Sequence, residues 1–222
     1  MKQKKTALIA GASGLIGNEL LHYLLEGAEY DRVTAIVRVP LNITHPKLEE
    51  KIISFDEMDH DKELFAVDDV FCCLGTTIKK AKTKEAMYKI DVEYPVQMAQ
   101  LASEKGAKKF LIVSSLNANP HSSIWYPKMK GQLEEKINQI PFQSIAIMQP
   151  SLLLGDRDEF RLGEKAGEIF FTFFACLFIG PLKKYKAIQG RTVSLAMYRI
   201  AQMNKTGIHI YPSEQIEQAA SN

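Results

Sequence analysis

The sequence contains few of the residues that mark secreted or metal-binding proteins. It has three cysteines among 222 residues, and two of them, Cys72 and Cys73, are adjacent. This number and spacing give no even set of disulfide partners and no zinc-ligand pattern, so no metal site is expected. The adjacent pair lies in an apolar run and is interpreted as part of a buried strand, with thiols that stay reduced in the cytoplasm.

An excess of charge of one sign is also missing. The 28 lysines and arginines are balanced by 26 acidic residues, which gives a formal net charge of +2. Because the basic residues are scattered, the charge pattern of a nucleic-acid-binding protein is missing, and no nucleic-acid partner is expected. One local cluster, IKKAKTK at 78–84, is interpreted as a solvated loop and helix start, with a positive rim beside an anionic ligand as the alternative.

Long apolar runs are absent as well. The run from Thr6 to Ala10 follows lysines but is shorter than the core of a signal peptide, so we expect a cytoplasmic protein. The segment from Ile169 to Leu182 has 14 residues, fewer than the ~20 that cross a bilayer, so no integral membrane segment is expected. A buried helix, or a contact between the subunits of a homo-oligomer, is the interpretation of this segment.

The sequence does contain short β-rich apolar runs that alternate with longer helical patterns. This alternation is typical of βαβ units, which build a doubly wound parallel sheet covered by helices on both faces. With 46% hydrophobic residues, the chain is predicted to be one α/β domain over 1–222, whose substrate cap comes mainly from 155–222. The predicted strands lie at 6–11, 32–38, 51–56, 69–75, 109–115, 144–150 and 207–212, and the helical patterns at 15–25, 84–105 and 127–138.

Three glycines stand between the first predicted strand and the first helical pattern, in the spacing G-x-x-G-x-x-G. A helix N-terminus offers unpaired backbone N–H groups and the positive end of the helix dipole, which together stabilise a phosphate. Gly11 is expected to allow the tight turn, Gly14 to let a pyrophosphate come close, and Gly17 to let the helix pack on the sheet. The spacing differs from the G-x-G-x-x-G dinucleotide fingerprint, and a plain structural turn is the alternative.

Other strand ends supply residues to the same crevice, because ligands of doubly wound sheets bind beyond the carboxyl ends of the strands. Arg38 ends the second predicted strand, where a cation accommodates the 2′-phosphate of NADP, so NADP(H) is the expected cofactor. A solvent-facing strand end is the alternative for Arg38. Ser13 is expected to add a hydrogen bond to that phosphate, and Asp56 to accept one from the adenine amino group. Gly75, within CCLGTT, would let the backbone pass beside the cofactor ribose.

A tyrosine and a lysine follow the fifth predicted strand, whose end carries two serines. Tyr126 and Lys130 are four residues apart, so on a helix they share a face. Reduction of a carbonyl needs a proton at the oxygen, and a nearby ammonium makes a phenol a better proton donor at neutral pH. Ser115, in preference to Ser114, is expected to hold the substrate carbonyl, with a local strand-end cap as the alternative. Pro127 is expected to make Tyr126 a cap residue outside the helix.

The segments GASGLIG, CLGTT and VSSLNANPHSSIWYPKMKGQLEEKI, together with Arg38, resemble an atypical short-chain dehydrogenase/reductase of the Tat-interacting-protein oxidoreductase-like subgroup. The similarity extends over nearly the whole chain and implies a single Rossmann domain that binds NADPH, with Tyr126 and Lys130 as the active-site pair. The subgroup usually has Arg-Pro-Gly where this chain has Gln-Pro-Ser at 149–151. The cofactor contacts that follow from the resemblance and from the strand ends are Ser13, Gly14, Leu15, Ile16, Arg38, Leu74, Gly75, Thr76, Pro150, Leu153 and Arg161.

These residues predict an NADPH-dependent oxidoreductase that reduces a small carbonyl compound. Tyr126 would donate the proton, Lys130 would bind the nicotinamide ribose, and Ser115 would orient the carbonyl. The alternative is a regulatory or interaction protein that binds NADPH with little or no turnover. A nucleotide-sugar epimerase would share the tyrosine and lysine chemistry, but the residues after Gly155 leave little material for its pocket. Arg161 is equally suited to an acidic substrate or to a surface ion pair.

Overall fold

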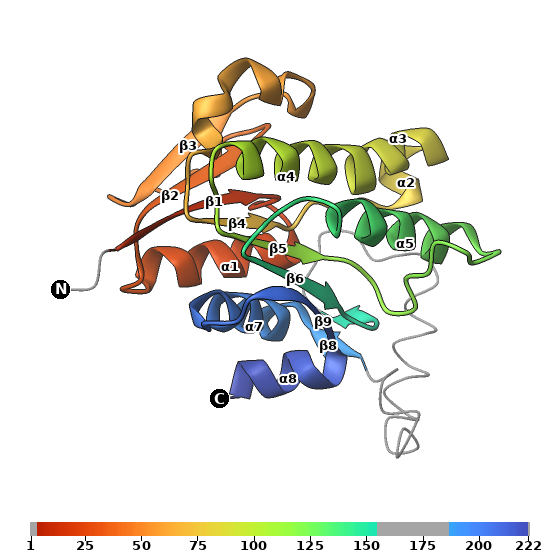
Figure 1. The fold of residues 1–222 in the computed structure, drawn as a ribbon. Coiled ribbons are helices and arrows are strands. Elements are labelled where there is room, and N and C mark those ends of the chain that lie inside the picture. The colour runs from red at the N-terminus through yellow and green to blue at the C-terminus, as the bar shows by residue number, and fades with distance from the viewer. Residues whose placement is uncertain (1–3, 155–186, 222) are drawn as a thin grey trace.

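The computed structural model describes residues 4–154 and 187–221, which form a seven-stranded sheet with helices on both faces (Figure 1). The strand order is β3-β2-β1-β4-β5-β6-β9, and each neighbouring pair is parallel. The chain order reverses between β1 and β4, and ligands of such sheets bind in the crevice beyond the ends of strands at this point. The prediction of a doubly wound parallel sheet is therefore confirmed.

The elements follow one another along the chain as repeated βαβ units do. A separate pair of short strands is formed by β7 and β8. The strands are β1 (Lys5–Ala10), β2 (Tyr30–Val37), β3 (Leu48–Ile52), β4 (Asp69–Cys72), β5 (Lys109–Val113), β6 (Ser144–Gln149), β7 (Leu153–Leu154), β8 (Ile188–Gln189) and β9 (Gly207–Pro212). The helices are α1 (Leu15–Glu26), the 3-10 helix η1 (Phe55–Phe65), α2 (Ile78–Ala81), α3 (Lys84–Tyr88), the π-helical turn η2 (Lys89–Glu93), α4 (Tyr94–Glu104), α5 (Trp125–Ile137), α7 (Gly190–Gln202) and α8 (Ser213–Ser221).

Two layers of buried apolar side chains, one on each face of the sheet, pack the sheet against its helices. The helices α1, α7 and α8 cover one face, and α4 and α5 cover the other (Figure 1). Along β1, Ala7 and Ile9 belong to the first layer and Leu8 and Ala10 to the second, and all four are fully buried. Strands buried on both faces are continuous apolar runs, which is why the sequence predicts these strands well.

Several predicted boundaries differ from the structure, three of them at elements near the candidate site. The third strand, expected at 51–56, is β3 at Leu48–Ile52, because the Ser54 hydroxyl accepts a hydrogen bond from the Asp56 backbone N–H and starts η1. The single helix expected at 84–105 is divided into α3, η2 and α4. The helix expected at 127–138 is α5, which begins two residues earlier, at Trp125, with Ile124 as its N-cap.

The described C-terminal residues, 187–221, extend the sheet and one of its helical layers. The strand β9 pairs with β6 at the sheet edge, and α7 packs on α1. The two helices approach closely because Gly190 has no side chain, and a Cβ at this position would lie 2.7 Å from Cγ of Leu15. The part of the predicted cap between 155 and 186 lies outside the described residues.

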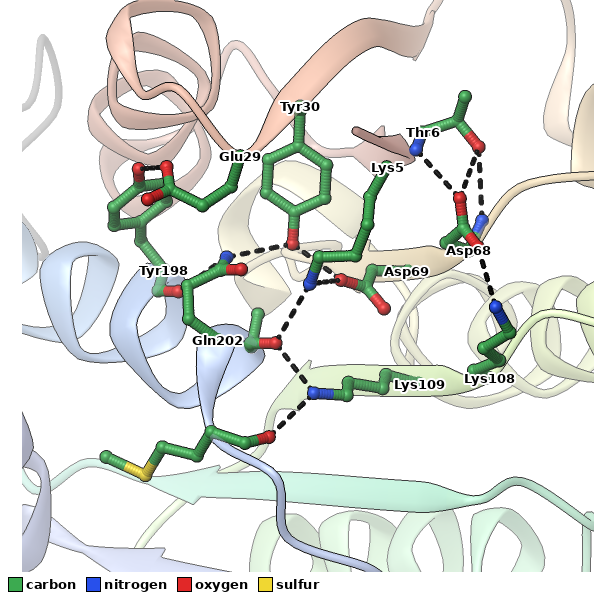
Figure 2. A network of polar contacts seen from close by, with 12 residues as sticks. Lys5, Thr6, Glu29, Tyr30, Asp68, Asp69, Lys108, Lys109, Tyr198 and Gln202 are labelled. Carbon is green, nitrogen blue, oxygen red and sulfur yellow. Dashed lines mark hydrogen bonds and ion pairs between the residues drawn. The ribbon is translucent and has the colours of Figure 1, made fainter. Parts of the chain in front are cut away.

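A polar network lies where the central strands β1, β4 and β5 begin (Figure 2). The glycine loop lies at the other end of β1. The buried Asp69 carboxylate, at the start of β4, accepts hydrogen bonds from the Tyr30 hydroxyl at 2.6 Å and from the Lys5 ammonium at 2.7 Å. The Lys109 ammonium donates to the carbonyl oxygen of Ala201, in the last turn of α7, at 2.8 Å. Because a cation at this end of a helix complements the helix dipole, the network fixes α7 to the sheet.

Asp69→Asn is expected to lower the free energy of unfolding by about 1.5–3 kcal/mol, because the Lys5 ammonium and the Tyr30 hydroxyl lose a charged acceptor inside the protein. Urea denaturation measures this loss. The control is Asp31→Asn, which makes the same change at an exposed position of β2. Equal stability of the two variants would contradict a structural role for the network.

Candidate active site

The glycine loop joins β1 to α1, and its shape requires glycine at two positions. Gly11 has a φ of 83°, a conformation that favours glycine, and a Cβ there would lie 2.5 Å from the carbonyl oxygen of Cys73, just after β4. A Cβ at Gly17 would lie 2.1 Å from the Gly11 carbonyl oxygen. The helix α1 therefore rests directly on the loop, in agreement with the turn and packing roles expected for Gly11 and Gly17.

The N-terminus of α1 is open to solvent at Gly14. This residue is the exposed N-cap, and no side chain caps the helix. The backbone N–H groups in the first turn of a helix have no partner within the helix and favour a bound anion. In α1 these groups include the N–H groups of Leu15 and Ile16. Ser13, also exposed, precedes them. The residues at this terminus therefore fit the phosphates of a dinucleotide.

Arg38 and Asp56, which were expected at the adenosine end of the cofactor, lie beyond β2 and β3. Arg38 is exposed directly after β2, and its guanidinium has no hydrogen bond or ion pair with the described residues. The Asp56 carboxylate, in η1, accepts from the Lys89 ammonium at 2.6 Å and from the Tyr94 hydroxyl at 3.0 Å, and these bonds lower the pKa of Asp56. The contact between Asp56 and adenine stays a prediction. In that contact, adenine would share the Asp56 carboxylate with the Lys89 ammonium and the Tyr94 hydroxyl.

Leu74, Gly75 and Thr76 follow β4 and lie beside a carboxylate that no sequence pattern singles out. Asp91, on η2, accepts a hydrogen bond from the Thr76 backbone N–H at 2.8 Å and forms an ion pair with the Lys130 ammonium at 2.9 Å. The side chains of Asp91 and Lys130 are 2% and 4% exposed. A Cβ at Gly75 would lie 3.8 Å from an Asp91 carboxylate oxygen. This acid joins the predicted cofactor loop to the predicted active-site lysine.

The helix α5 carries both Tyr126 and Lys130. Its N-cap is Ile124, and the Lys128 N–H donates to the Ile124 carbonyl oxygen at 3.1 Å, so Tyr126 lies in the first helical turn. The expectation that Pro127 makes Tyr126 a cap residue is therefore wrong. The first N–H groups of a helix have no partner within it, so a proline fits inside this turn without losing a hydrogen bond.

Lys130 is a buried cation with a fixed partner. Burial disfavours its ammonium form, but the Asp91 carboxylate, with the Tyr126 phenol nearby, outweighs burial and raises the pKa of Lys130. Removing one member of a buried ion pair typically lowers the free energy of unfolding by about 3–5 kcal/mol. Asp91 and Lys130 therefore stabilise each other inside the protein. On β4, burial raises the pKa of the Cys72 thiol to about 12, in agreement with its interpretation as a core residue.

The two serines after β5 have different surroundings. The Ser114 hydroxyl is buried and donates to the Glu134 carboxylate, which also accepts from the Gln149 side-chain amide at 2.9 Å. Burial raises the pKa of Glu134. Ser115 is only half-buried and donates to the Leu116 carbonyl oxygen at 3.2 Å. Ser115 is thus the more exposed serine, as its expected contact with a substrate requires.

The remaining predicted contacts lie at the end of β6 and beyond it. Pro150 is buried directly after β6, and Leu153 is half-buried in β7. Arg161 and the apolar segment from Ile169 to Leu182 lie outside the described residues. Among residues 4–154 and 187–221, no helix is long and apolar enough to cross a bilayer, and no three His, Cys, Asp or Glu side chains are grouped so that they could hold a metal ion.

A hollow of about 300 Å³ flanks the start of α5, and it is lined by Lys84, Glu85, Tyr88, Glu93 and Trp125. The Lys84 ammonium lies 5.6 Å from the centroid of the Trp125 ring, within the range of a cation–π contact. The lysine cluster at 78–84 forms α2 and the start of α3, and its lysines are exposed. This placement agrees with the interpretation of the cluster as a solvated helix start.

Comparison with known proteins identifies the relatives of the chain. The family model described as "NAD dependent epimerase/dehydratase family" matches residues 7–212. Protein HTATIP2 of Rattus norvegicus is 35% identical over 173 residues, which cover 76% of this chain and 71% of the rat protein. Protein FMP52, mitochondrial, of Saccharomyces cerevisiae is 34% identical over 158 residues, which cover 68% of this chain and 66% of the yeast protein. The resemblance inferred from the sequence motifs is confirmed.

These relatives correct the expected location. The proteins from Saccharomyces cerevisiae, Aspergillus niger and Eremothecium gossypii are named mitochondrial, so the expectation of a cytoplasmic protein is wrong. That expectation depended on the few cysteines and on the short apolar run before the glycine loop. Cysteine usage reports the redox conditions that a protein meets and does not encode its destination.

Solved structures share the fold. MoeE5 in complex with UDP-glucuronic acid and NAD superposes with a TM-score of 0.71 at 15% identity, covering 93% of this chain and 75% of that protein. The UDP-glucuronic acid 4-epimerase from Bacillus cereus gives a TM-score of 0.68 at 13% identity, covering 93% and 76%. With the glycine loop, the parallel sheet and the match over residues 7–212 in agreement, the chain belongs to the NAD dependent epimerase/dehydratase family.

Proposed function

We propose that the protein is an NADPH-dependent oxidoreductase that reduces a small carbonyl compound. The observation that carries the proposal is the start of α5, where Tyr126 precedes the buried Lys130 by one helical turn beside the loop after β4. A fixed cation next to a phenol is suited to delivering a proton to a carbonyl oxygen. The open N-terminus of α1, at the same edge of the sheet, supports dinucleotide binding there.

The proposed reaction adds a hydride and a proton across a C=O bond. When bound, NADPH would supply the hydride for the carbonyl carbon and would be left as NADP⁺. Tyr126 gives its phenolic proton to the carbonyl oxygen, which completes the alcohol, and later takes a proton back from water. Lys130 stabilises the phenolate in the interval and binds the nicotinamide ribose, while the Ser115 hydroxyl holds the carbonyl oxygen by a hydrogen bond.

Measurement of hydride transfer tests this proposal against its alternative, a protein that binds NADPH for a regulatory or interaction role. Native mass spectrometry of the purified protein identifies the bound nucleotide. The protein is then mixed with NADPH and a panel of aldehydes, ketones and quinones, and NADPH absorbance is followed. Consumption of NADPH with an equal yield of alcohol supports the reductase. Tight binding without consumption across the panel supports the alternative, and no dinucleotide binding contradicts both.

The proposed preference for NADPH over NADH depends on Arg38. Its guanidinium is exposed beyond β2 and is not used by any described residue, so it is available to a phosphate. Arginine binds phosphate oxygens through parallel, charge-assisted hydrogen bonds. NADH lacks the 2′-phosphate and would not gain this interaction.

Arg38→Ala is expected to raise the Kd of NADPH by about 10- to 100-fold, since a hydrogen bond to a charged group contributes about 1.5–3 kcal/mol. The Kd of NADH should change little. Fluorescence titration of both nucleotides measures the difference. Arg32→Ala is the matched control, because Arg32 is also exposed on β2 but lies near the opposite end of the strand. Equal losses of NADPH and NADH affinity in Arg38→Ala would contradict the phosphate role.

A further inference from the structure

Three carboxyl groups are buried in the part of the chain that the structure describes: Asp69, Asp91 and Glu134. Asp69 pairs with the Lys5 ammonium at 2.7 Å. Asp91 pairs with the Lys130 ammonium at 2.9 Å. Glu134, on α5, forms no ion pair with the described residues, and its bonds there are to neutral groups. A buried carboxylate without a counter-charge is costly, so the protonation of Glu134 differs in kind from that of the other two acids.

The hydrogen-bond partners of Glu134 come from two neighbouring strands. The Ser114 hydroxyl, directly after β5, donates to Oε1. The Gln149 amide nitrogen, at the end of β6, lies 2.9 Å from Oε2 and 3.0 Å from Oε1. Glu134 therefore joins α5 to the ends of β5 and β6, where Ser115 and Pro150 follow.

Lys130, one helical turn before Glu134, is the charged group that acts on this acid. The Lys130 ammonium is bonded to Asp91 on η2, and the described side chains of α4 form no hydrogen bond or ion pair with Glu134. Burial is the strongest influence and raises the pKa of Glu134. The subgroup that the sequence resembles usually has arginine at position 149, where the glutamine of this chain offers no charge.

We infer that Glu134 is a pH-sensitive switch, which keeps its proton at a pH where exposed glutamates are ionised and changes its hydrogen bonds when it loses that proton. The ionised carboxylate accepts from both the Ser114 hydroxyl and the Gln149 amide. The protonated carboxyl carries an O–H donor. The Ser114 hydroxyl can accept from this donor, whereas the Gln149 nitrogen cannot, so the amide must turn or lose a bond. The proton thus decides how α5 is joined to β5 and β6.

NMR of protein with ¹³C-labelled glutamate tests the switch directly. The Glu134 signal is assigned by its loss in Glu134→Gln, and the control is Glu135, the next residue, which is exposed. Glu134 should titrate at a higher pH than Glu135, and the backbone amide signals of Ser115 and Ser151 should change over the same pH range. In Gln149→Arg, the added cation should move the Glu134 titration down by about 1–3 pH units and leave Glu135 unchanged.

The pH profile of carbonyl reduction gives a second measurement, which rests on the proposed function. Ionised Glu134 fixes Ser114 beside Ser115, the proposed carbonyl contact, so kcat should rise as Glu134 loses its proton. In Gln149→Arg this acidic limb should move to lower pH together with the titration. Glu134→Gln resembles the protonated form and should keep a low kcat at every pH, with a loss of up to about 100-fold. Glu135→Gln should keep the wild-type profile.

Titration of Glu134 at the same pH as Glu135 would overturn the inference, and so would amide signals of Ser115 and Ser151 that do not follow Glu134. An acidic limb that stays in place in Gln149→Arg, despite a moved titration, would overturn the link to catalysis. The NMR measurements need no turnover. A protein that shows the expected titrations but reduces no carbonyl compound would therefore contradict the reductase and support the switch.

Thermal unfolding of Glu134→Gln replaces Gln149→Arg if the arginine variant does not fold. Because the pKa of Glu134 is raised in the folded protein, the folded state binds more protons than the unfolded state between the two pKa values. The wild type therefore loses stability as pH rises through this range. Glutamine has no such proton to lose, so the Tm of Glu134→Gln relative to wild type should increase with pH. A constant Tm difference would overturn the inference.

Discussion

Tyr126→Phe is expected to lower kcat for carbonyl reduction by about 100- to 10,000-fold, which is the range that a positioned general acid contributes. Phenylalanine keeps the aromatic ring, which is packed against the apolar layer that contains α4 and α5, and removes only the hydroxyl. The affinity for NADPH should therefore stay close to that of the wild type. Steady-state kinetics and fluorescence titration of the nucleotide measure the two quantities separately.

Tyr211→Phe is the matched control for this variant. The Tyr211 hydroxyl, on β9, is buried and makes no hydrogen bond with the described residues. Its removal leaves no partner unsatisfied among the described residues, so neither activity nor stability should fall. If Tyr126→Phe turned over as fast as the wild type, Tyr126 would not be the proton donor. If both variants lost activity equally, the loss would not report on proton transfer.

The sheet and its glycine loop could be predicted because their signals are local. The strand β1 is apolar at each position from Ala7 to Ala10, since both of its faces are covered. The need for glycine at Gly11 and Gly17 comes from contacts within the β1–α1 turn and with the adjacent end of β4. Similar contacts are found in the glycine-rich turns between strand and helix that bind a dinucleotide. The spacing of the glycines in the sequence therefore indicates this turn.

Helix boundaries were harder to predict because they depend on backbone geometry that composition does not report. The residues from 84 to 104 have one continuous helical pattern, yet η2 interrupts it with a π-helical turn. A π-turn inserts one extra residue per turn and changes no residue type, so hydrophobic periodicity gives little sign of it. The shift matters at Asp91, which lies on that turn and is buried beside Lys130.

The polar partners of the site were missed for a related reason. Asp91 and Glu134 are acids within helical patterns, where an acid is normally exposed. Their meaning comes from groups that are distant in the sequence, Lys130 for Asp91 and Gln149 for Glu134. A pattern that finds catalytic residues by type and spacing cannot detect these pairs, because the fold alone brings their members together.

The single glycine of α5, Gly131, shows how closely the site depends on packing. A Cβ at Gly131 would lie 2.1 Å from the Pro120 nitrogen and 2.2 Å from the Asn119 carbonyl carbon. Both atoms belong to the backbone of the loop that leads from Ser115 to α5, and the Asn119 N–H also donates to the Pro127 carbonyl oxygen at 2.9 Å. The loop therefore rests on the helix at the one position where α5 has no side chain in its way.

Gly131→Ala should force the loop and the helix apart, because neither backbone can rotate away as a side chain would. Overpacking typically costs about 1–3 kcal/mol and sometimes more, and contact with backbone places this variant near the upper end. Alanine recovers about 1 kcal/mol of helix propensity, which does not offset the clash. With a net loss of about 2 kcal/mol, Tm should fall by about 4–8 °C in a domain of this size. Calorimetry measures the change.

Gly75→Ala is the control for stability, since a Cβ there would make only an ordinary contact of 3.8 Å. Its Tm should match that of the wild type. Activity provides a second measurement for Gly131→Ala, because the displaced loop carries Ser115 while the helix carries Tyr126 and Lys130. A shift of about 1 Å between such groups can cost 100-fold in rate, so kcat should fall at temperatures where the variant is still folded. A Gly131→Ala protein with wild-type Tm and kcat would show that the loop does not position Ser115 against α5.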